Sequence, residues 1–442
     1  MSTPFEKLSP VPEPKVIGRA EHGLSRSRID PDALKVLYRL HRQGHIAYLV
    51  GGGVRDLLLG NQPKDFDIST SAHPNEVRKL FSNCRLIGRR FRLAHIYFKG
   101  GKIIEVSTFR TISDFSTEDG RITSDNTFGT PGEDAFRRDF TVNALFYNIA
   151  DFSIIDYMGG LEDLKKGVVR CIGDPKLRFL EDPIRMLRGV RFAALLDFSL
   201  DPESDRLIRS KGEMIWEGAV PRILEEIVRM MGRGTAARAM ERLVDSGLIS
   251  HLFPQIDQHI RMEGIEPYTS ILSRMDKRFR AGQTLEPWLI MSCLFYPLFE
   301  FVHRGSPGED HAGLARDTIS PACKRIQVPR KVQDLARQVL AAQPRLFGLK
   351  DGRFKPRTIL RKAYFEDAFT LFAIAAAGDD KGRDLIREWE ELRGEKPRSD
   401  NPRSAGDRKP QGLRQGQRPK PRRRRRRGPR TGRPPGHPKI SE

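Results

Sequence analysis

A strand that runs directly into three glycines and a short helix restricts the fold of this chain more than any other feature. Residues 47–50 (AYLV) form an apolar run, residues 51–53 are all glycine, and residues 54–60 (VRDLLLG) have helical apolar spacing. Glycines lack a Cβ and let a phosphate approach backbone N–H groups at the start of a helix. The spacing matches neither the Walker A nor the dinucleotide-binding pattern, so a turn that merely reverses the chain is the simpler interpretation of the glycines alone.

Strand and helix patterns are interleaved up to about residue 172. The strand-like runs are residues 47–50, 65–69, 85–88, 93–98 and 102–109. From about residue 173 long helical periods dominate, for example at residues 183–196 and 221–231, and strand signals nearly vanish. This order predicts an α+β fold class, in which a mixed sheet with helices precedes an all-helical remainder.

The charge is concentrated at the C-terminal end. The chain has a formal net charge of +21, and residues 396–442 contain 17 Lys and Arg against three acidic residues, so this segment carries +14. It also holds nine Pro and six Gly and almost no large apolar side chains, so it cannot bury enough surface to offset the entropy of ordering. We therefore predict a disordered basic tail, either an RNA-binding arm or a solubilising segment, and a polyanionic partner, with nucleic acid before acidic membranes.

The remaining composition excludes several classes. The cysteines match no metal-binding spacing and lie far apart, at Cys84, Cys171, Cys293 and Cys323, so neither structural zinc nor a disulfide framework is expected. The most apolar stretch, residues 288–302, contains Pro297 and Glu300 and is shorter than the ~20 residues that span a bilayer. With no signal-like N-terminus, we expect a cytoplasmic protein without a membrane span.

Two aspartates follow the glycine turn closely. In KDFDIST, Asp65 and Asp67 are two apart on a predicted strand, which turns both carboxylates to one face while Phe66 and Ile68 face the core. Carboxylates this close repel each other unless a cation lies between them, and they suit Mg²⁺, or Mn²⁺, held jointly with substrate phosphates. An acidic pair on a solvated strand edge is the alternative, but the preceding glycine turn favours the metal site.

A third carboxylate would complete a two-metal site for phosphoryl transfer. Glu105 stands in an otherwise apolar and β-branched strand, IIEVSTF, where an acid is costly unless it is paired with a cation; a solvated strand face would also explain it. Asp139, in RRDFTVNALFYN, opens a segment with helical spacing, and there the alternative is an acid favoured by the helix dipole. The residues alone leave both candidates open.

Basic and polar residues surround these acids in the sequence. Arg137 and Arg138 could pair with a triphosphate, and Asn143, one turn after Asp139, could orient a ribose or base. Within residues 178–194 a helix is predicted with Asp182 at its cap and Pro183 at its first position, which aligns three arginines on one side at three-residue intervals, at Arg185, Arg188 and Arg191. Asp182 and Arg185 would offer the acceptors and donors that a base edge needs, whereas a salt-bridged surface helix is the alternative.

Taken together, these motifs resemble the class II polymerase β-like nucleotidyltransferases, which comprise tRNA CCA-adding enzymes and bacterial poly(A) polymerases. The motifs are LVGGGVRDLLLG, DFDIST, RRDFTVNALFYN, EDPIRMLRGVRFAA and RILEEIVRM, between about residues 30 and 250. Residues 86–98, KDFD in place of GDxD, and the Arg- and Pro-rich end are similar to the poly(A) polymerase branch.

The resemblance implies a domain order. A loosely ordered leader (1–29) would precede a polymerase β-like catalytic head (30–172) and a helical neck with the nucleotide-base pocket (173–250). A helical RNA-binding body (251–395) and the disordered tail (396–442) would follow.

The resemblance also implies roles for individual residues. Gly51 and Gly52 would bind the triphosphate, and Arg55, Arg138 and Asn143 would help to hold the nucleotide. Asp65 and Asp67 would bind metal, with Glu105 as the candidate third ligand, and Asp139 would belong to the catalytic site. Asp182 and Arg185 would lie beside the base, supported by Arg222, Glu226 and Arg229.

The activity expected from the resemblance is template-independent polyadenylation of RNA 3′ ends. AMP would be transferred from ATP by two-metal in-line transfer with release of pyrophosphate, in mRNA processing and decay. One alternative is addition of CCA, or only its final A, to tRNA. Another is a non-catalytic RNA-binding protein on a transferase scaffold.

Overall fold

The computed structural model describes residues 12–88, 93–111, 117–118, 121–122, 128–305, 310–349 and 355–394. The predicted disordered tail, residues 396–442, lies outside the described residues. The described residues all belong to one compact unit that ends at Gly394. Within this unit we call residues 12–172 the sheet region and residues 173–394 the helical region.

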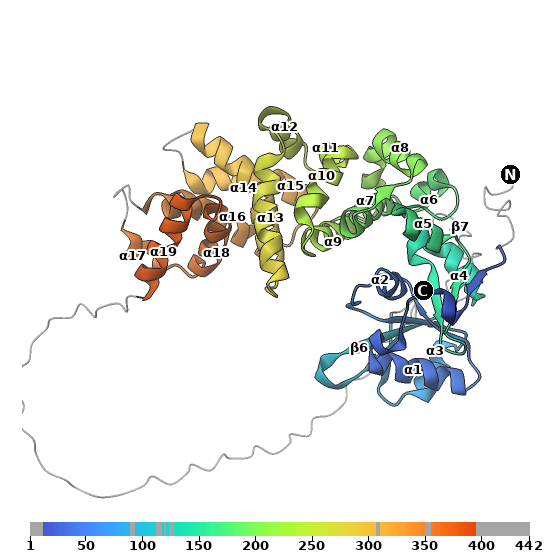
Figure 1. Ribbon diagram of the computed structural model, residues 1–442. Helices are drawn as coiled ribbons and strands as arrows, with labels where there is room; N and C mark the ends of the chain where they lie inside the picture. The colour runs from blue at the N-terminus through green and yellow to red at the C-terminus, as the bar shows by residue number, and fades with distance from the viewer. Residues whose placement is uncertain are drawn as a thin grey trace, which may run out of the picture. The chain divides into compact units, whose positions relative to one another are not determined.

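An eight-stranded sheet organises the sheet region (Figure 1). Its strands are β1 (Lys15–Ile17), β2 (Ala47–Val50), β3 (Asp67–Thr70), β4 (Cys84–Ile87), β5 (Leu93–Tyr97), β6 (Ile103–Thr108), β9 (Leu145–Asn148) and β10 (Ile154–Asp156). The spatial order is β1-β10-β9-β2-β3-β6-β5-β4, in which β3 and β6 pair in parallel and the other neighbours are antiparallel. Two-stranded pairs join β7 (Thr117–Glu118) to β8 (Arg121–Ile122), and β11 (Val168–Val169) to β12 (Ser199–Leu200).

Side chains along the strands point alternately to the two faces of the sheet, and each face packs into its own hydrophobic cluster. Leu49 packs into one hydrophobic cluster with Val36 and Leu37 of α1, whereas the next residue, Val50, packs into a second cluster with Ala135 of α4. The helices of the sheet region are α1 (Pro31–Arg42), α2 (Gly52–Leu58), α3 (Pro74–Leu80), α4 (Pro131–Arg137) and α5 (Gly160–Lys166).

Helices make up almost all of the helical region, shown in green to red in Figure 1. They are α6 (Pro175–Glu181), α7 (Ile184–Leu196), α8 (Pro202–Lys211), α9 (Val220–Met231), α10 (Ala236–Asp245), α11 (Leu248–Leu252), α12 (Pro254–Glu263), α13 (Glu266–Arg280), α14 (Pro287–Gly305), α15 (His311–Arg325), α16 (Arg330–Phe347), α17 (Pro356–Leu360), α18 (Phe365–Ala376) and α19 (Asp380–Gly394). One buried cluster reaches from Phe140 to Trp389, so these helices share a continuous apolar core. The predicted α+β class is confirmed.

The helix predicted to begin at Pro183 is present as α7, which starts at Ile184 with Pro183 at its N-cap, and Asp182 precedes it in an extended conformation at φ −147°, ψ 92°. The helical spacing predicted after Asp139 is not borne out. The segment after Asp139 is a short 3-10 turn (Thr141–Asn143) followed by β9. Its apolar residues are buried on both faces of a central strand, and such a strand has a continuous apolar run that resembles a helical pattern.

Part of the predicted leader is also structured. Residues Lys15–Ile17 form β1, which pairs with β10 at the edge of the sheet, and two 3-10 turns follow at Arg19–Glu21 and Arg26–Arg28. Asp30 caps α1 as predicted, since its carboxylate accepts hydrogen bonds from the N–H groups of Asp32 and Ala33. Among the described residues, no helix combines the length and apolar character needed to cross a bilayer.

Candidate active site

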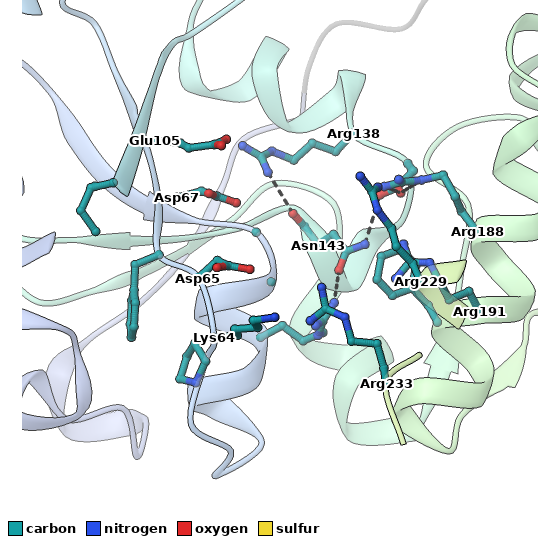
Figure 2. A pocket seen from close by; sticks show the side chains of 18 of the residues that line it. Lys64, Asp65, Asp67, Glu105, Arg138, Asn143, Arg188, Arg191, Arg229 and Arg233 are labelled. Carbon is teal, nitrogen blue, oxygen red and sulfur yellow. Dashed lines mark hydrogen bonds and ion pairs between the residues drawn. The ribbon is translucent and has the colours of Figure 1, made fainter. Parts of the chain in front are cut away.

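A cavity of about 1120 Å³ lies between the sheet region and helices α7 and α9. The residues predicted from the sequence to contact nucleotide or metal line it: Gly51, Gly52, Arg55, Asp65, Asp67, Glu105, Arg137, Arg138, Asp139, Asn143, Asp182 and Arg185. Glu226, predicted to support the base pocket, is not among the lining residues. Figure 2 shows Asp65, Asp67 and Glu105 on one side of the cavity and arginines of the helical region on the other. The fold therefore opposes an acidic wall to a basic wall.

The glycine turn connects β2 to α2 at one end of the cavity. Gly51 has φ +69°, and a Cβ there would lie 3.1 Å from an Nη atom of Arg138, so only glycine fits without strain. Helix α2 begins at Gly52, and the N–H groups of a first helical turn have no partner within the helix. These N–H groups and the Arg138 guanidinium can bind phosphate oxygens.

Strand register brings the candidate metal ligands together. Ile68 of β3 pairs in parallel with Val106 of β6, which places Asp67 and Glu105 next to each other at the preceding position. Asp65 lies just before β3 rather than on it, although it faces the same cavity (Figure 2). Phe66 and Ile68 are buried, as the sequence predicts.

The electrostatics of Asp67 fit a cation site. Its side chain is open to the cavity, but the surrounding protein partly removes it from bulk water. This partial burial, together with the negative charges of Glu105 and Asp65, raises the pKa of Asp67 to about 6, although the positive charge of Arg138 acts to lower it. A divalent cation would relieve this repulsion. Among the described residues no three His, Cys, Asp or Glu side chains converge closely enough to enclose a metal ion by themselves. That suits Mg²⁺, which commonly takes one or two carboxylates together with substrate phosphates.

Asp139 has a different environment from the other three carboxylates. It is buried, and its Oδ1 accepts hydrogen bonds from the Phe140 N–H (2.8 Å) and from Asn143 Nδ2 (3.1 Å), while its Oδ2 accepts one from Arg188 Nε (2.8 Å). Burial alone would raise its pKa, but the Arg188 charge and these hydrogen bonds hold the pKa below its ordinary value. With both oxygens engaged, Asp139 links the two walls, whereas Glu105 lies beside Asp67.

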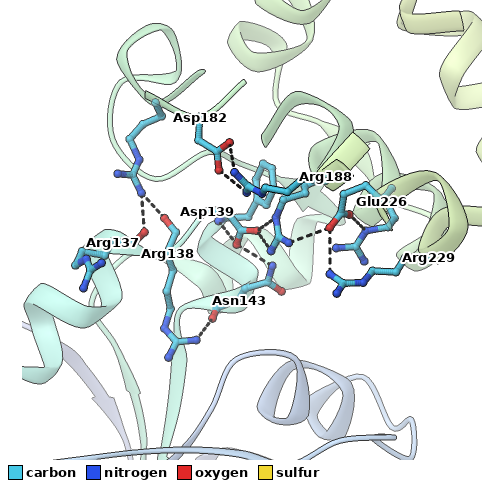
Figure 3. A network of polar contacts seen from close by, with 12 residues as sticks. Arg137, Arg138, Asp139, Asn143, Asp182, Arg188, Glu226 and Arg229 are labelled. Atoms are coloured by element: carbon cyan, nitrogen blue, oxygen red, sulfur yellow. Dashed lines mark hydrogen bonds and ion pairs between the residues drawn. The ribbon is translucent and has the colours of Figure 1, made fainter. Parts of the chain in front are cut away.

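A chain of hydrogen bonds runs through Asp139 from the sheet region into the helical region (Figure 3). Arg55 donates to Asn143 Oδ1, and Asn143 donates in turn to Asp139. Beyond Asp139, Arg188 also donates to Glu226, which is buried. Glu226 accepts further hydrogen bonds from two more arginines of the cavity, Arg191 at 2.6 Å and Arg229 at 3.3 Å. The network fixes most of the basic wall.

The residues predicted to read a base are engaged with protein partners. Arg222 donates two parallel hydrogen bonds to the Asp182 carboxylate, at 2.9 and 2.8 Å. Arg185 donates to Glu181 and to the backbone carbonyl of Arg178. Both residues still line the cavity, so their remaining donors and acceptors can face a ligand.

Several cavity residues were missed from the sequence, among them two cations, Lys64 and Arg233. Lys64 precedes Asp65, and Arg233 follows the end of α9; both line the cavity near the glycine turn (Figure 2). The chain position of Lys64 beside the acidic pair was a usable signal. No pattern distinguishes Arg233 from the many other arginines of this chain.

The chain matches three families over most of its length. Residues 47–170 match the "Poly A polymerase head domain", residues 197–260 the "Probable RNA and SrmB-binding site of polymerase A", and residues 311–429 the "Polymerase A arginine-rich C-terminus". The first match contains the glycine turn and all three carboxylates of the proposed metal site.

Known relatives show the same similarity. Poly(A) polymerase I of Escherichia coli O157:H7 is 39% identical over 403 residues, which cover 86% of each chain. The CCA-adding enzyme of Lactobacillus helveticus is 41% identical over 218 residues, 49% of this chain and 53% of that protein. Among solved structures, the Bacillus stearothermophilus CCA-adding enzyme in complex with CTP has a TM-score of 0.59 at 28% identity and covers 82% of this chain and 84% of its own.

Proposed function

This chain belongs to the bacterial poly(A) polymerase I family and is therefore a nucleotidyltransferase, and on that premise we propose that it adds AMP units from ATP to RNA 3′ ends without a template. The observation that carries this choice is the extent of the similarity. The E. coli poly(A) polymerase I relative matches 86% of the chain, and the arginine-rich C-terminal family matches residues 311–429, whereas the L. helveticus CCA-adding enzyme matches 49%.

The chain's own residues bind and orient the nucleotide in this proposal. The N–H groups that follow Gly51 bind the triphosphate, and Arg138 adds a positive charge beside them. Asp182 and Arg185 lie beside the adenine. The polar network through Asp139 and Glu226 holds the arginines of the opposite wall in position.

The transfer needs no covalent enzyme intermediate. The RNA 3′-hydroxyl oxygen forms a bond to the α-phosphorus of ATP, the bond from that phosphorus to the oxygen bridging to the β-phosphate breaks, and pyrophosphate leaves. The hydroxyl proton passes to solvent. Asp65 and Asp67, with Glu105 beside Asp67, would hold Mg²⁺ together with substrate phosphates, and the metal would supply Lewis-acid stabilisation of the attacking and leaving oxygens.

The proposal extends to the domain order and the setting of the reaction. The head (30–172) carries out catalysis, and the neck (173–250) contains the base pocket. The body (251–395) and the tail (396–442) contact the RNA. The enzyme would act in the cytoplasm on mRNA. A non-catalytic RNA-binding role is set aside because the family is enzymatic.

Single labelled nucleotides test the proposal directly. The protein is incubated with a generic RNA and with tRNA that lacks CCA, each with labelled ATP or labelled CTP alone. We expect long ATP-dependent extension of the generic RNA and little CTP incorporation. An Asp67→Ala protein that extends RNA at the wild-type rate would contradict the assigned site.

Addition of CCA, or of its final A, to tRNA is the second candidate. It is favoured by the 41% identity to the L. helveticus CCA-adding enzyme over 218 residues. Efficient incorporation of CTP into tRNA lacking CCA, with no extension of the generic RNA, would decide for this candidate.

A further inference from the structure

A smaller cavity of about 310 Å³ adjoins the candidate active site. The two cavities share four lining residues, Asp67, Glu105, Arg137 and Arg138. The other residues of the smaller cavity are Val50, Ile68, Leu93, Ser107, Arg110 and Asp134. Two of the proposed metal-binding carboxylates therefore stand at a boundary that can be reached from both cavities.

The two arginines at this boundary differ in their contacts. Arg138 donates to Asp134 at 3.0 Å, to Ser69 at 3.4 Å and to the backbone carbonyl of Asn143 at 3.3 Å, and it approaches Gly51 of the phosphate turn. In the described part of the chain, the Arg137 side chain makes no hydrogen bond or ion pair at all; its Nε atom, like that of Arg138, is buried without an acceptor. A buried donor without a partner costs about 1–3 kcal/mol, so Arg137 is suited to an anionic ligand.

The position of Arg137 is nevertheless fixed through its backbone. Arg178 of α6, which is buried, donates hydrogen bonds to three consecutive carbonyls at the end of α4, those of Phe136, Arg137 and Arg138. The guanidinium of Arg178 thus neutralises the negative end of the α4 dipole and holds its last turn. The backbone of Arg137 is therefore held in place at the boundary between the two cavities, while its own guanidinium remains available to a ligand.

The proposed reaction indicates which anion Arg137 would bind. The nucleotide is provided for in the larger cavity by the glycine turn, Arg138 and the residues of the base pocket. In-line displacement places the attacking oxygen opposite the leaving pyrophosphate, so a second polyanion, the RNA acceptor, must reach the same carboxylates from another direction. Its volume puts the smaller cavity at the lower end of the ~300–1,000 Å³ range of ligand pockets, as expected for a single residue of a longer chain.

We propose that the smaller cavity holds the 3′-terminal nucleotide of the acceptor RNA, and that Arg137 binds the phosphodiester linking this nucleotide to the one before it. The assignment rests on the proposed transfer to RNA and adds the acceptor subsite to it. It gives Arg137 and Arg138, adjacent in the sequence, different substrates: the acceptor for Arg137 and the incoming nucleotide for Arg138.

Steady-state kinetics with each substrate varied in turn separate these roles. For Arg137→Gln we expect the KM for a short oligoadenylate to rise about tenfold, because a hydrogen bond to a charged group is removed, while the KM for ATP stays within about twofold of wild type. Arg137→Lys should recover part of the loss. For Arg138→Gln the KM for ATP should rise instead. Arg78→Gln, on the exposed face of α3, is the matched control and should change neither value.

A chemical change in the RNA tests the phosphate itself. A methylphosphonate at the last linkage removes its charge, and it should weaken binding of the oligoadenylate to wild-type protein about as much as Arg137→Gln does, with no further loss when both changes are combined. Equal weakening of wild type and variant by the methylphosphonate would overturn the proposal, as would a rise in the KM for ATP alone. Because this dissociation constant is measured without ATP, a protein that binds the oligonucleotide this way but incorporates only CTP would refute the proposed function and leave the acceptor subsite standing.

Discussion

Arg188 of α7 donates a hydrogen bond to Asp139 across the boundary between the sheet and helical regions, with 2.8 Å between Nε and Oδ2. The two residues are 49 positions apart in the chain, and Asp139 is buried where they meet. The same guanidinium continues to Glu226, so one ion pair joins the wall that carries the carboxylates to the wall that carries the arginines (Figure 3). The two walls of the candidate site are therefore held together through this ion pair.

Removal of this ion pair should destabilise the protein strongly. We expect Asp139→Asn to lower the free energy of unfolding by about 3 kcal/mol at neutral pH, because it leaves the Arg188 charge in a mostly buried site with only its longer contact to Glu226. Urea denaturation measures the change. Asp182→Asn, which weakens a partly exposed pair with Arg222, is the control and should cost about 1 kcal/mol or less. Equal destabilisation of the two variants would show that burial does not increase the contribution of the Asp139–Arg188 pair to the free energy of unfolding.

The stabilisation by Asp139 should disappear only in acid. Its folded-state pKa is lowered, despite the opposing effect of burial, so the contribution is complete above the ordinary aspartate pKa and is lost as pH falls through the lowered value. The stability difference between wild type and Asp139→Asn should thus stay constant from about pH 6 to 8 and shrink only below about pH 4. A difference that grew on acidification would contradict this assignment.

Asp67 should show the opposite sign in the metal-free protein. Its pKa rises from an ordinary 3.8 to about 6 in the fold. The ionised Asp67 carboxylate therefore destabilises the folded state. This destabilisation is absent below pH 3.8, grows as the pH rises to about 6, and is complete above pH 6. With allowance for solvent screening, Asp67→Asn should stabilise the protein by about 1 kcal/mol at pH 8 in the presence of a chelator and have no effect near pH 3.5.

Added Mg²⁺ provides the control for this prediction. It should raise the melting temperature of the wild type, since a cation that binds only the folded state stabilises it by mass action, and it should raise that of Asp67→Asn much less. A wild type that is more stable than Asp67→Asn in chelator at pH 8 would show that the carboxylates do not repel one another in the fold.

Much of the candidate site could be predicted from local patterns. Strand periodicity placed the residues on either side of Asp67, and the acid in an apolar strand marked Glu105 as a candidate metal ligand, because both effects act within a few residues. The start of α7 was also encoded locally, because Asp182 followed by Pro183 marks the beginning of a helix. Ion pairs such as that between Asp139 and Arg188 depend on how distant elements pack, so no repeating pattern in the sequence predicts them.

Glu226 illustrates such a long-range interaction in the helical region. It is buried and accepts hydrogen bonds from Arg188, Arg191 and Arg229. We expect Glu226→Gln to raise the KM for ATP and to lower stability by about 2 kcal/mol, since three like charges lose the anion that holds them together. Nucleotide titration and urea denaturation measure the two effects. Glu225→Gln removes only an exposed 3.7 Å contact with Arg229, so it is the control and should change both quantities much less. A KM for ATP that is unaffected by Glu226→Gln would place the nucleotide away from these arginines.

Removal of the basic tail should separate RNA affinity from catalysis. Residues 396–442 carry +14 of the net charge of +21, so their deletion removes most of the cations that can release counterions from RNA. We expect the slope of log Kd against log salt concentration to fall by ~0.7 for each RNA phosphate that the shortened protein no longer neutralises, with weaker RNA binding at low salt. Single-nucleotide transfer at saturating RNA should persist, because every proposed site residue lies before residue 250. A truncated protein that binds nucleotide with unchanged affinity but transfers none would instead place part of the catalytic machinery in the tail.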